Sequence, residues 1–151
     1  MFGFSNKKRF EICDKIGIKI HKQISEALTE NSAALSEPED AIFFHGYLNG
    51  FMIGFTSIHD SSNSWAVDVK YKKHICEGVI PGRLWDIFER AQAIAQLSDQ
   101  AGFDVEELWD LGKKSGWYDS QRQLVGGDNL FRYLTGEEID LAFYDDYVKT
   151  S

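Results

Sequence analysis

The longest uncharged stretch of the chain covers residues 41–58 and contains no Asp, Glu, Lys or Arg. Three glycines recur within it at every fourth position: Gly46, Gly50 and Gly54. On a helical wheel, the aromatic residues form one row, the glycines lie beside that row, and a narrow polar stripe remains. A helix that is apolar on most of its sides is typical of the centre of a helical domain. We therefore predict a central core helix over residues 38–59.

These glycines call for a physical reason, because each interior glycine costs a helix about 1 kcal/mol relative to alanine. Small residues at every fourth position allow a second helix backbone to approach closely, and this close approach can offset that cost. We predict close helix packing at Gly46, Gly50 and Gly54 against a helix of the same chain. A homodimer formed through this glycine stripe is the alternative.

Periodic apolar positions predict further helices on both sides of the central one. Steps of three and four residues indicate a first helix over residues 5–28, and the strongest pattern indicates another over residues 82–102, ended by Gly102. Asp104 is a typical N-cap residue, and it predicts a short helix that ends at Gly116.

The last third of the chain carries two more helix-start signals. Asp128 is suited to cap a short helix, and Thr135 with Glu138 forms a capping box that predicts a final helix to about Lys149. Residues 65–80 fit both a strand and a helix. Because a single strand without a partner cannot form a sheet, helical or irregular structure is favoured there.

Length and composition agree with one folded domain. A chain of 151 residues with 43% hydrophobic and 26% charged residues is typical of a globular protein. The elements together predict an all-α fold, with a single compact domain over residues 1–151 and five to seven helices around the helix of residues 38–59. The uncharged run has 18 residues and includes several polar ones. A membrane span needs about 20 predominantly apolar residues, so none is predicted.

The net charge of −8 changes which partners are expected. A negative field repels phosphates, which disfavours nucleic acid and suits a basic protein partner. Residues 124–151 alone carry −4. The first twenty residues lack the order of a secretory signal, so a cytoplasmic location is expected. Cys13 and Cys76 are isolated in the sequence, and whether they pair is left open.

The sequence contains no recognisable motif of catalytic residues. The four histidines and two cysteines form no known metal motif, and no nucleophile elbow or phosphate-binding loop occurs. No catalytic residue, cofactor or metal site is therefore predicted. The polar stripe of the central helix, made of His45, Asn49, Thr56 and His59, is the candidate lining of a ligand pocket, with solvent contact as the alternative.

The acidic C-terminal segment is the candidate partner surface. Asp140, Tyr144, Asp145 and Asp146 place an aromatic ring among carboxylates, which is the composition of an interface hot spot with a charged rim. The acidic segment of residues 104–110 is a second candidate surface.

Two short segments, HGYLNG and HICEGVIPGRLWDIF, resemble the immunity proteins that block type VI secretion amidases. Those are small helical proteins with a Gly-Tyr-x-x-Gly helix and a later Cys before an amphipathic helix. The resemblance covers a handful of positions, and no site residue follows from it.

The function predicted from the sequence is that of a non-enzymatic, protein-binding helical domain with an acidic surface: an adaptor, regulator or immunity-type inhibitor. The alternative is a small-ligand binder or enzyme with a polar pocket beside His45, Asn49 and His59.

Overall fold

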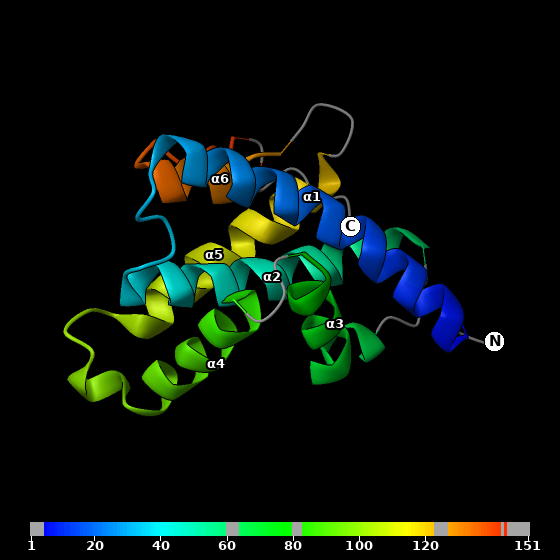
Figure 1. Ribbon diagram of the computed structural model, residues 1–151, viewed down its shortest axis with the longest axis horizontal. Coiled ribbons are helices and arrows are strands. Elements are labelled where there is room, and N and C mark those ends of the chain that lie inside the picture. Colours follow the sequence, from blue (N-terminus) through cyan, green and yellow to red (C-terminus); the bar gives the residue numbers. More distant parts are fainter. Residues whose placement is uncertain (1–4, 60–63, 80–82, 123–126, 143, 145–151) are drawn as a thin grey trace.

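The chain folds as a succession of helices joined by short turns (Figure 1). This computed structural model describes residues 5–59, 64–79, 83–122, 127–142 and 144. The helices are α1 (Asn6–Glu30), α2 (Pro38–His59), α3 (Val69–Val79), α4 (Arg83–Gln96), α5 (Val105–Gln121) and α6 (Asn129–Thr135), with 3-10 turns at Ser64–Val67 and Ser98–Gln100. Over these described ranges the chain contains no strand, which confirms the all-α prediction.

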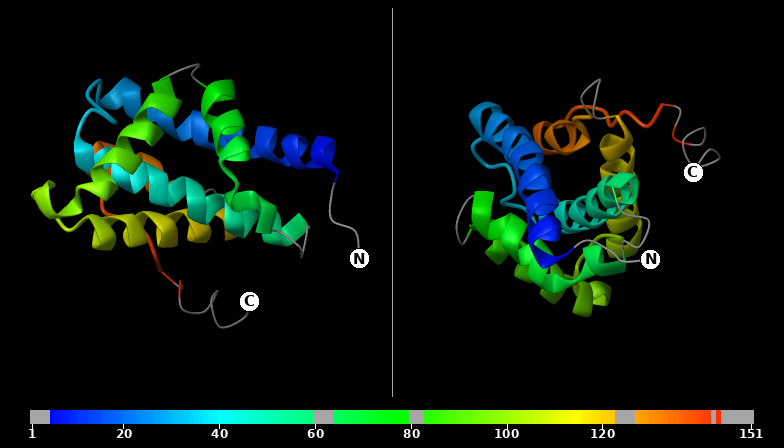
Figure 2. Two further views of the ribbon diagram at one scale, coloured as in Figure 1. Left: turned by 90° about the horizontal axis from the view of Figure 1, so that it is seen from below. Right: turned by 90° about the vertical axis from the view of Figure 1, so that its right-hand side faces the viewer.

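Helix α2 lies at the centre of the packed helices, as the sequence predicts. Figure 2 shows it surrounded by α1, α5 and the pair α3 and α4. Fourteen of its 22 residues are buried, including Phe43, Tyr47 and Phe51. No helix of the described residues is long and apolar enough to cross a lipid bilayer.

The closest packing in the domain joins α2 to α5, and both helices contribute glycines to it. A Cβ atom at Gly46 or Gly50 would overlap the carbonyl oxygen of Trp109 or Lys113. In the opposite direction, Gly112 lies against the backbone of Phe43. The residue numbers of the facing positions increase in the same direction along both helices, from Gly46 against Trp109 to Gly50 against Lys113. Helices α2 and α5 therefore run parallel. The glycine stripe faces α5 of the same chain, and a second copy would have to displace α5 to reach it.

This packing explains why α5 is longer than the sequence predicts. Gly116 was expected to end the helix, but α5 continues through it to Gln121. The Gly116 backbone lies against α2, where a Cβ would overlap the carbonyl oxygen of Tyr47 and approach the Phe51 nitrogen to 2.8 Å. Its lack of a side chain serves interhelical contact and not helix termination.

The expected start of a final helix at Thr135 is wrong. Thr135 is the last residue of α6, and its hydroxyl bonds back to the Phe131 carbonyl. Gly136 follows in the left-handed region with φ 79°, which ends the helix. Residues 137–141 that follow are not helical. Tyr144 is helical, and the rest of the expected helix, residues 143 and 145–149, lies outside the described residues.

Residues 65–80, which the sequence leaves open, form a 3-10 turn and helix α3 on either side of Asp68, over the described residues 65–79. Trp65 and Ala66 are buried in the 3-10 turn, and α3 follows after Asp68. The first helix agrees closely with its prediction, since Ser5 caps α1 through its side chain. Helix α4 ends at Gln96, six residues before the predicted stop at Gly102.

Candidate functional site

A groove follows the exposed face of α5, and we call it the α5 groove. It consists of two adjoining hollows of 490 and 460 Å³ that share Asp110 and Lys114. The first hollow is lined by Gly50, Ile53, Asp110, Lys113, Lys114, Trp117 and Tyr144. The second is lined by Asp104, Glu106, Glu107, Asp110, Leu111 and Lys114. Helical spacing produces this arrangement, because residues 106, 110, 113, 114 and 117 follow three- and four-residue steps on one side of α5.

One end of the α5 groove is aromatic. The rings of Trp117 and Tyr144 meet edge to face, with centroids 5.8 Å apart and an interplanar angle of 79°. Ile53 of α2 adds an aliphatic wall, and Gly50 also lines this hollow. Partly exposed aromatic and aliphatic groups of this kind are typical anchors for an apolar side chain of a partner.

The other end of the α5 groove is acidic. Asp104 accepts a hydrogen bond from the Glu107 amide and so caps α5, at 3.0 Å. Glu106, Glu107 and Asp110 are exposed around it. Among described residues, none of these four carboxylates has an ion-pair partner within 4.0 Å. Carboxylates at a helix N-terminus also stabilise the helix through its dipole, which is the purely structural alternative.

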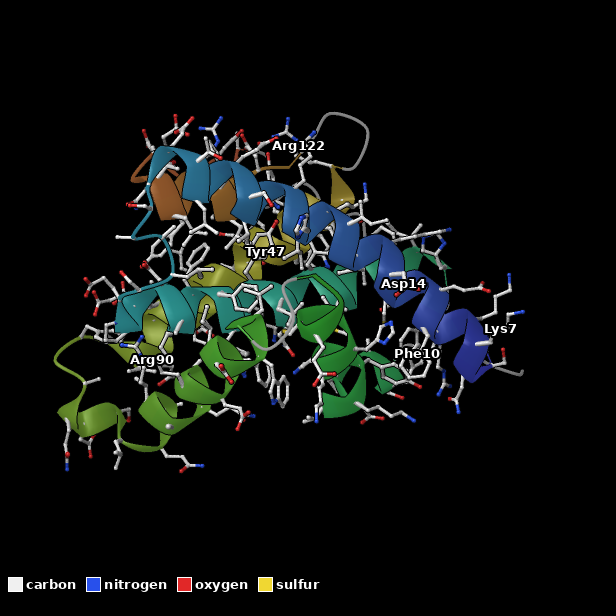
Figure 3. All side chains as sticks on the ribbon, in the orientation of Figure 1. Lys7, Phe10, Asp14, Tyr47, Arg90 and Arg122 are labelled. Atoms are coloured by element: carbon white, nitrogen blue, oxygen red, sulfur yellow. The ribbon has the colours of Figure 1, made fainter. Side chains whose placement is uncertain are left out.

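Behind the groove, a buried carboxyl group joins four helices. Gln23 Nε2 of α1 donates to Tyr47 Oη of α2 at 2.7 Å, and Tyr47 Oη donates to Asp119 Oδ2 of α5 at 2.6 Å. The backbone and side-chain nitrogens of Asn129 also donate to Asp119, at 2.8 and 3.0 Å. Gln23 completes the network by accepting from the Phe131 amide at 3.0 Å. Figure 3 shows Tyr47 in the middle of the molecule.

Burial sets the ionisation of this carboxyl group. Asp119 is only 2% exposed, and its burial raises its pKa to about 7. The hydrogen bonds from Tyr47 and Asn129 act in the opposite direction because they favour the charged form. Burial is the larger effect, so Asp119 titrates near neutral pH.

The predicted pocket residues of α2 have other partners. Trp109 Nε1 donates to His45 Nδ1 at 2.7 Å, and the His45 ring stacks on Phe88. Burial lowers the pKa of His45 to about 4, so this imidazole is neutral at physiological pH. Thr56 is buried and donates to the Met52 carbonyl at 2.6 Å.

The other two residues of the stripe differ in exposure. Asn49 is buried at 8% exposure. His59 is exposed at the end of α2 and packs on Phe55. None of the four stripe residues lines the α5 groove or the three other hollows that are best formed among the described residues.

The predicted partner-surface residues are only partly brought together. Asp140 pairs with Arg122 at 3.1 Å and caps the Ala142 amide with its other oxygen at 3.0 Å. Tyr144 follows Asp140 by four residues in the sequence and lines the α5 groove instead. Asp145 and Asp146 lie outside the described residues.

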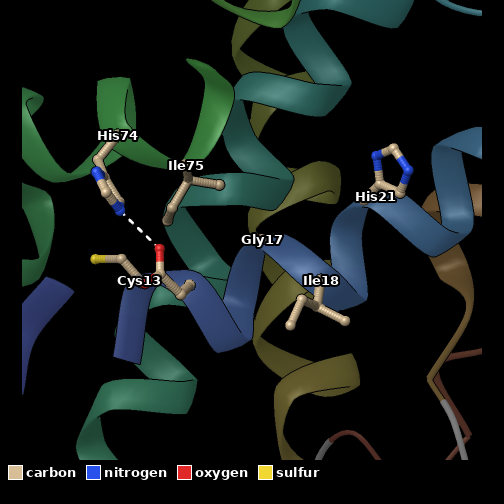
Figure 4. A pocket seen from close by; sticks show the side chains of 7 residues that line it. Cys13, Gly17, Ile18, His21, His74 and Ile75 are labelled. Atoms are coloured by element: carbon tan, nitrogen blue, oxygen red, sulfur yellow. Dashed lines mark hydrogen bonds and ion pairs between the residues drawn. The ribbon is translucent and has the colours of Figure 1, made fainter. Parts of the chain in front are cut away.

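A third feature is the hollow of 320 Å³ between α1 and α3 (Figure 4). Asp14 Oδ1 and His74 Nε2 meet across it at 2.7 Å, and Cys13, Gly17 and Ile75 line it. No group of three or more His, Cys, Asp or Glu side chains that could hold a metal ion occurs among the described residues.

The two cysteines give a simple prediction. Cys13 and Cys76 are unpaired and buried, and burial raises the pKa of each thiol to about 12. At pH 8 the thiolate fraction should be about a thousandfold below that of a free cysteine. We expect a thiol reagent to label the native protein far more slowly than the protein unfolded in denaturant. Equal labelling rates in the two states would contradict the buried, protonated assignment.

No family model matches the chain, and no significantly similar protein was found among curated sequences or solved structures. Its function is therefore argued from its own residues.

Sequence reasoning missed two parts of this arrangement. Asp119 resembles any other helical aspartate in the sequence. Only its spacing of three residues from Gly116 and seven from Gly112 indicates that it lies near the buried face of α5. Trp117 falls outside the short helix that the sequence predicts, because that helix is expected to end at Gly116. A helix continued through both glycines would have placed Trp117 on the same face as Asp110.

Proposed function

We propose that this protein is a non-enzymatic partner-binding domain whose α5 groove takes a basic segment of another polypeptide. The observation that carries the proposal is the joining of an acidic end and an aromatic end in one groove. The acidic end suits lysine and arginine side chains, and the end formed by Ile53, Trp117 and Tyr144 suits one apolar anchor.

The dimensions of the groove fit a short segment. From Asp104 to Trp117 the helix rises about 20 Å at 1.5 Å per residue. This length accommodates about six residues of extended chain or about thirteen residues of helix. The whole groove carries four carboxylates against Lys113 and Lys114, so its lining is negative overall. A cytoplasmic location is part of the proposal, and the unpaired cysteines are in keeping with it.

A synthetic peptide tests the proposal directly. The probe is a peptide of about twelve residues in which lysines flank one leucine, and the control probe replaces the lysines by glutamates. We expect the basic peptide alone to bind, with an association rate that falls as salt is raised. Surface plasmon resonance or stopped-flow kinetics would measure both rates.

Two variants separate the ends of the groove. Glu106→Lys with Asp110→Lys should slow association about tenfold, because rim charges act mainly on the on-rate. Tyr144→Ala should instead speed dissociation about tenfold, because it removes an anchor contact.

A matched control carries the same change in net charge elsewhere. Glu11 and Glu30 are exposed on α1 and lie outside the groove, so Glu11→Lys with Glu30→Lys should change the association rate much less. Equal slowing by the two charge-reversed pairs would mean that only the overall charge attracts the peptide. Failure of the wild-type protein to bind it would remove the proposed function.

A further inference from the structure

Residues 137–142 and Tyr144 form a segment that crosses the ends of α5 and α6, and we call it the strap. The strap is held at Glu138, Asp140 and Ala142. Arg132 Nη1 donates to the Glu138 carbonyl at 3.2 Å, and Arg122 pairs with the Asp140 carboxylate at 3.1 Å. Asn129 Nδ2 donates to the Asp140 carbonyl at 2.8 Å, and the Asp140 amide donates to Asn129 Oδ1 at 2.7 Å. The Tyr118 hydroxyl donates to the Ala142 carbonyl. Beyond these contacts, Tyr144 stands against Trp117 in the α5 groove.

The Asn129 side chain can make both bonds to the strap only in one orientation. Its amide oxygen must face the Asp140 N–H, and its amide nitrogen must face the Asp140 carbonyl. The second hydrogen of that nitrogen points to Asp119 Oδ1 at 3.0 Å, while the Asn129 backbone N–H points to Asp119 Oδ2 at 2.8 Å. Asp119 accepts both, so it fixes the orientation that the strap requires.

We propose that Asp119 and Asn129 are positioning residues of the α5 groove, which hold the strap so that Tyr144 forms the groove wall against Trp117. This inference rests on the proposed function for its biological meaning, because it assigns the wall of the same groove. The contacts that hold Tyr144 against Trp117 can be tested without any partner. The chain of contacts runs from the buried Asp119 to Asn129, then to Asp140, and through the strap to Tyr144.

Tyr47 provides a matched control. It also donates to Asp119 Oδ2, at 2.6 Å, but it lies on α2 and its two hydrogen-bond partners are Asp119 and Gln23. If Asp119 only stabilised the fold, loss of the Tyr47 hydrogen bonds and loss of the Asn129 hydrogen bonds would have the same effect on the position of Tyr144. A positioning role predicts that only Asn129 and Asp119 affect Tyr144.

The first readout needs no ligand. The protein is labelled with 5-fluorotryptophan, and the ¹⁹F resonance of Trp117 is assigned by its loss in Trp117→Phe. Tyr144→Ala should shift this resonance, because the neighbouring ring is removed. Asn129→Ala and Asp119→Asn should shift it in the same way, whereas Tyr47→Phe should leave it in place.

Folding is controlled within the same spectra. The resonances of Trp65, Trp85 and Trp109 report on the rest of the domain and should stay unchanged in each variant. If Asn129→Ala does not fold, Asn129→Ser keeps a small polar group at this position and should produce the same shift of Trp117. An unshifted Trp117 resonance in a folded Asn129 variant, with a shifted one in Tyr144→Ala, would overturn the inference.

The second readout uses the basic peptide described above. Asn129→Ala should weaken binding about as much as Tyr144→Ala, and the double variant should be no weaker than either single one, because both remove the same wall. If the losses of binding free energy in the two single variants added fully in the double variant, the inference would be overturned. If the wild-type protein does not bind the peptide, the proposed function fails while the ¹⁹F result still decides the role of Asn129 and Asp119.

Discussion

Gly50→Ala should destabilise the domain by about 2 kcal/mol, although alanine is the better helix former. The new Cβ atom would overlap the carbonyl oxygen of Lys113 and lie 2.8 Å from its carbonyl carbon. Both atoms belong to the α5 backbone, so the overlap can be removed only if α2 and α5 move apart. Overpacking of this kind costs about 1–3 kcal/mol and sometimes more, against a gain of about 1 kcal/mol from helix propensity. Chemical denaturation followed by circular dichroism measures the loss.

Gly54→Ala is the matched comparison. Its Cβ would meet the Ser120 hydroxyl and approach Trp117 Cδ1 to 3.0 Å, and both of these are side-chain atoms. Side chains can move, so we expect a smaller loss of about 1 kcal/mol, partly restored by adding Ser120→Ala. A Gly50→Ala variant that is more stable than the wild type would contradict the close packing of α2 on α5.

Asp119→Ala should be comparably damaging, with a loss of about 3 kcal/mol or more in the free energy of unfolding. The substitution leaves the Tyr47 hydroxyl and two Asn129 N–H groups without their acceptor. Each buried donor without a partner costs about 1–3 kcal/mol. Tyr47→Phe removes one donor together with its hydrogen bonds, so it should cost less.

The pH dependence gives a sharper test of Asp119 than the size of the loss. Burial raises its pKa from 3.8 to about 7, so the folded state holds this proton more tightly than the unfolded state does. The resulting stability is fully present below about pH 4 and is lost as the pH rises to about 7. The slope is at most about 1.4 kcal/mol per pH unit.

A second titrating group makes a comparison necessary. The pKa of His45 is lowered from 6.5 to about 4, so its contribution has the opposite sign and is lost as the pH falls from about 6.5 to about 4. Subtracting the stability of Asp119→Asn from that of the wild type at each pH cancels the His45 contribution. The difference should shrink from about pH 4 to about pH 7 and stay level above it. A difference that is constant or grows with pH would show that Asp119 is ionised throughout.

The sequence predicts the helices better than their ends. The uncharged run of residues 41–58 identifies α2 as the centre, and its glycine spacing indicates a close neighbour. The identity of that neighbour does not follow, because Gly112 and Gly116 have the same local appearance whether they end a helix or face one. Which of these roles a glycine has depends on whether α2 packs against it, and that packing depends on the tertiary structure and not on the local sequence.

The candidate site was predictable only in fragments. The acidic segment of residues 104–110 and the ring of Tyr144 were both identified, on separate surfaces. The structure brings them into one groove because α5 continues to Trp117 and because the strap returns across it. Asp119 could not be identified in advance, since an aspartate on a polar helix is usually solvated and nothing local marks this one as buried.

The most direct test of the α5 groove is a titration of the ¹⁵N-labelled protein with the basic leucine-containing peptide, followed by NMR. We expect the largest shift changes at the Trp117 indole and at the amides of Ile53, Asp110, Lys114 and Tyr144. Smaller changes should follow along the acidic end, and the glutamate peptide should cause none of them. Changes centred on the hollow between α1 and α3, or beside His45 and His59, would place the binding site elsewhere and contradict the account.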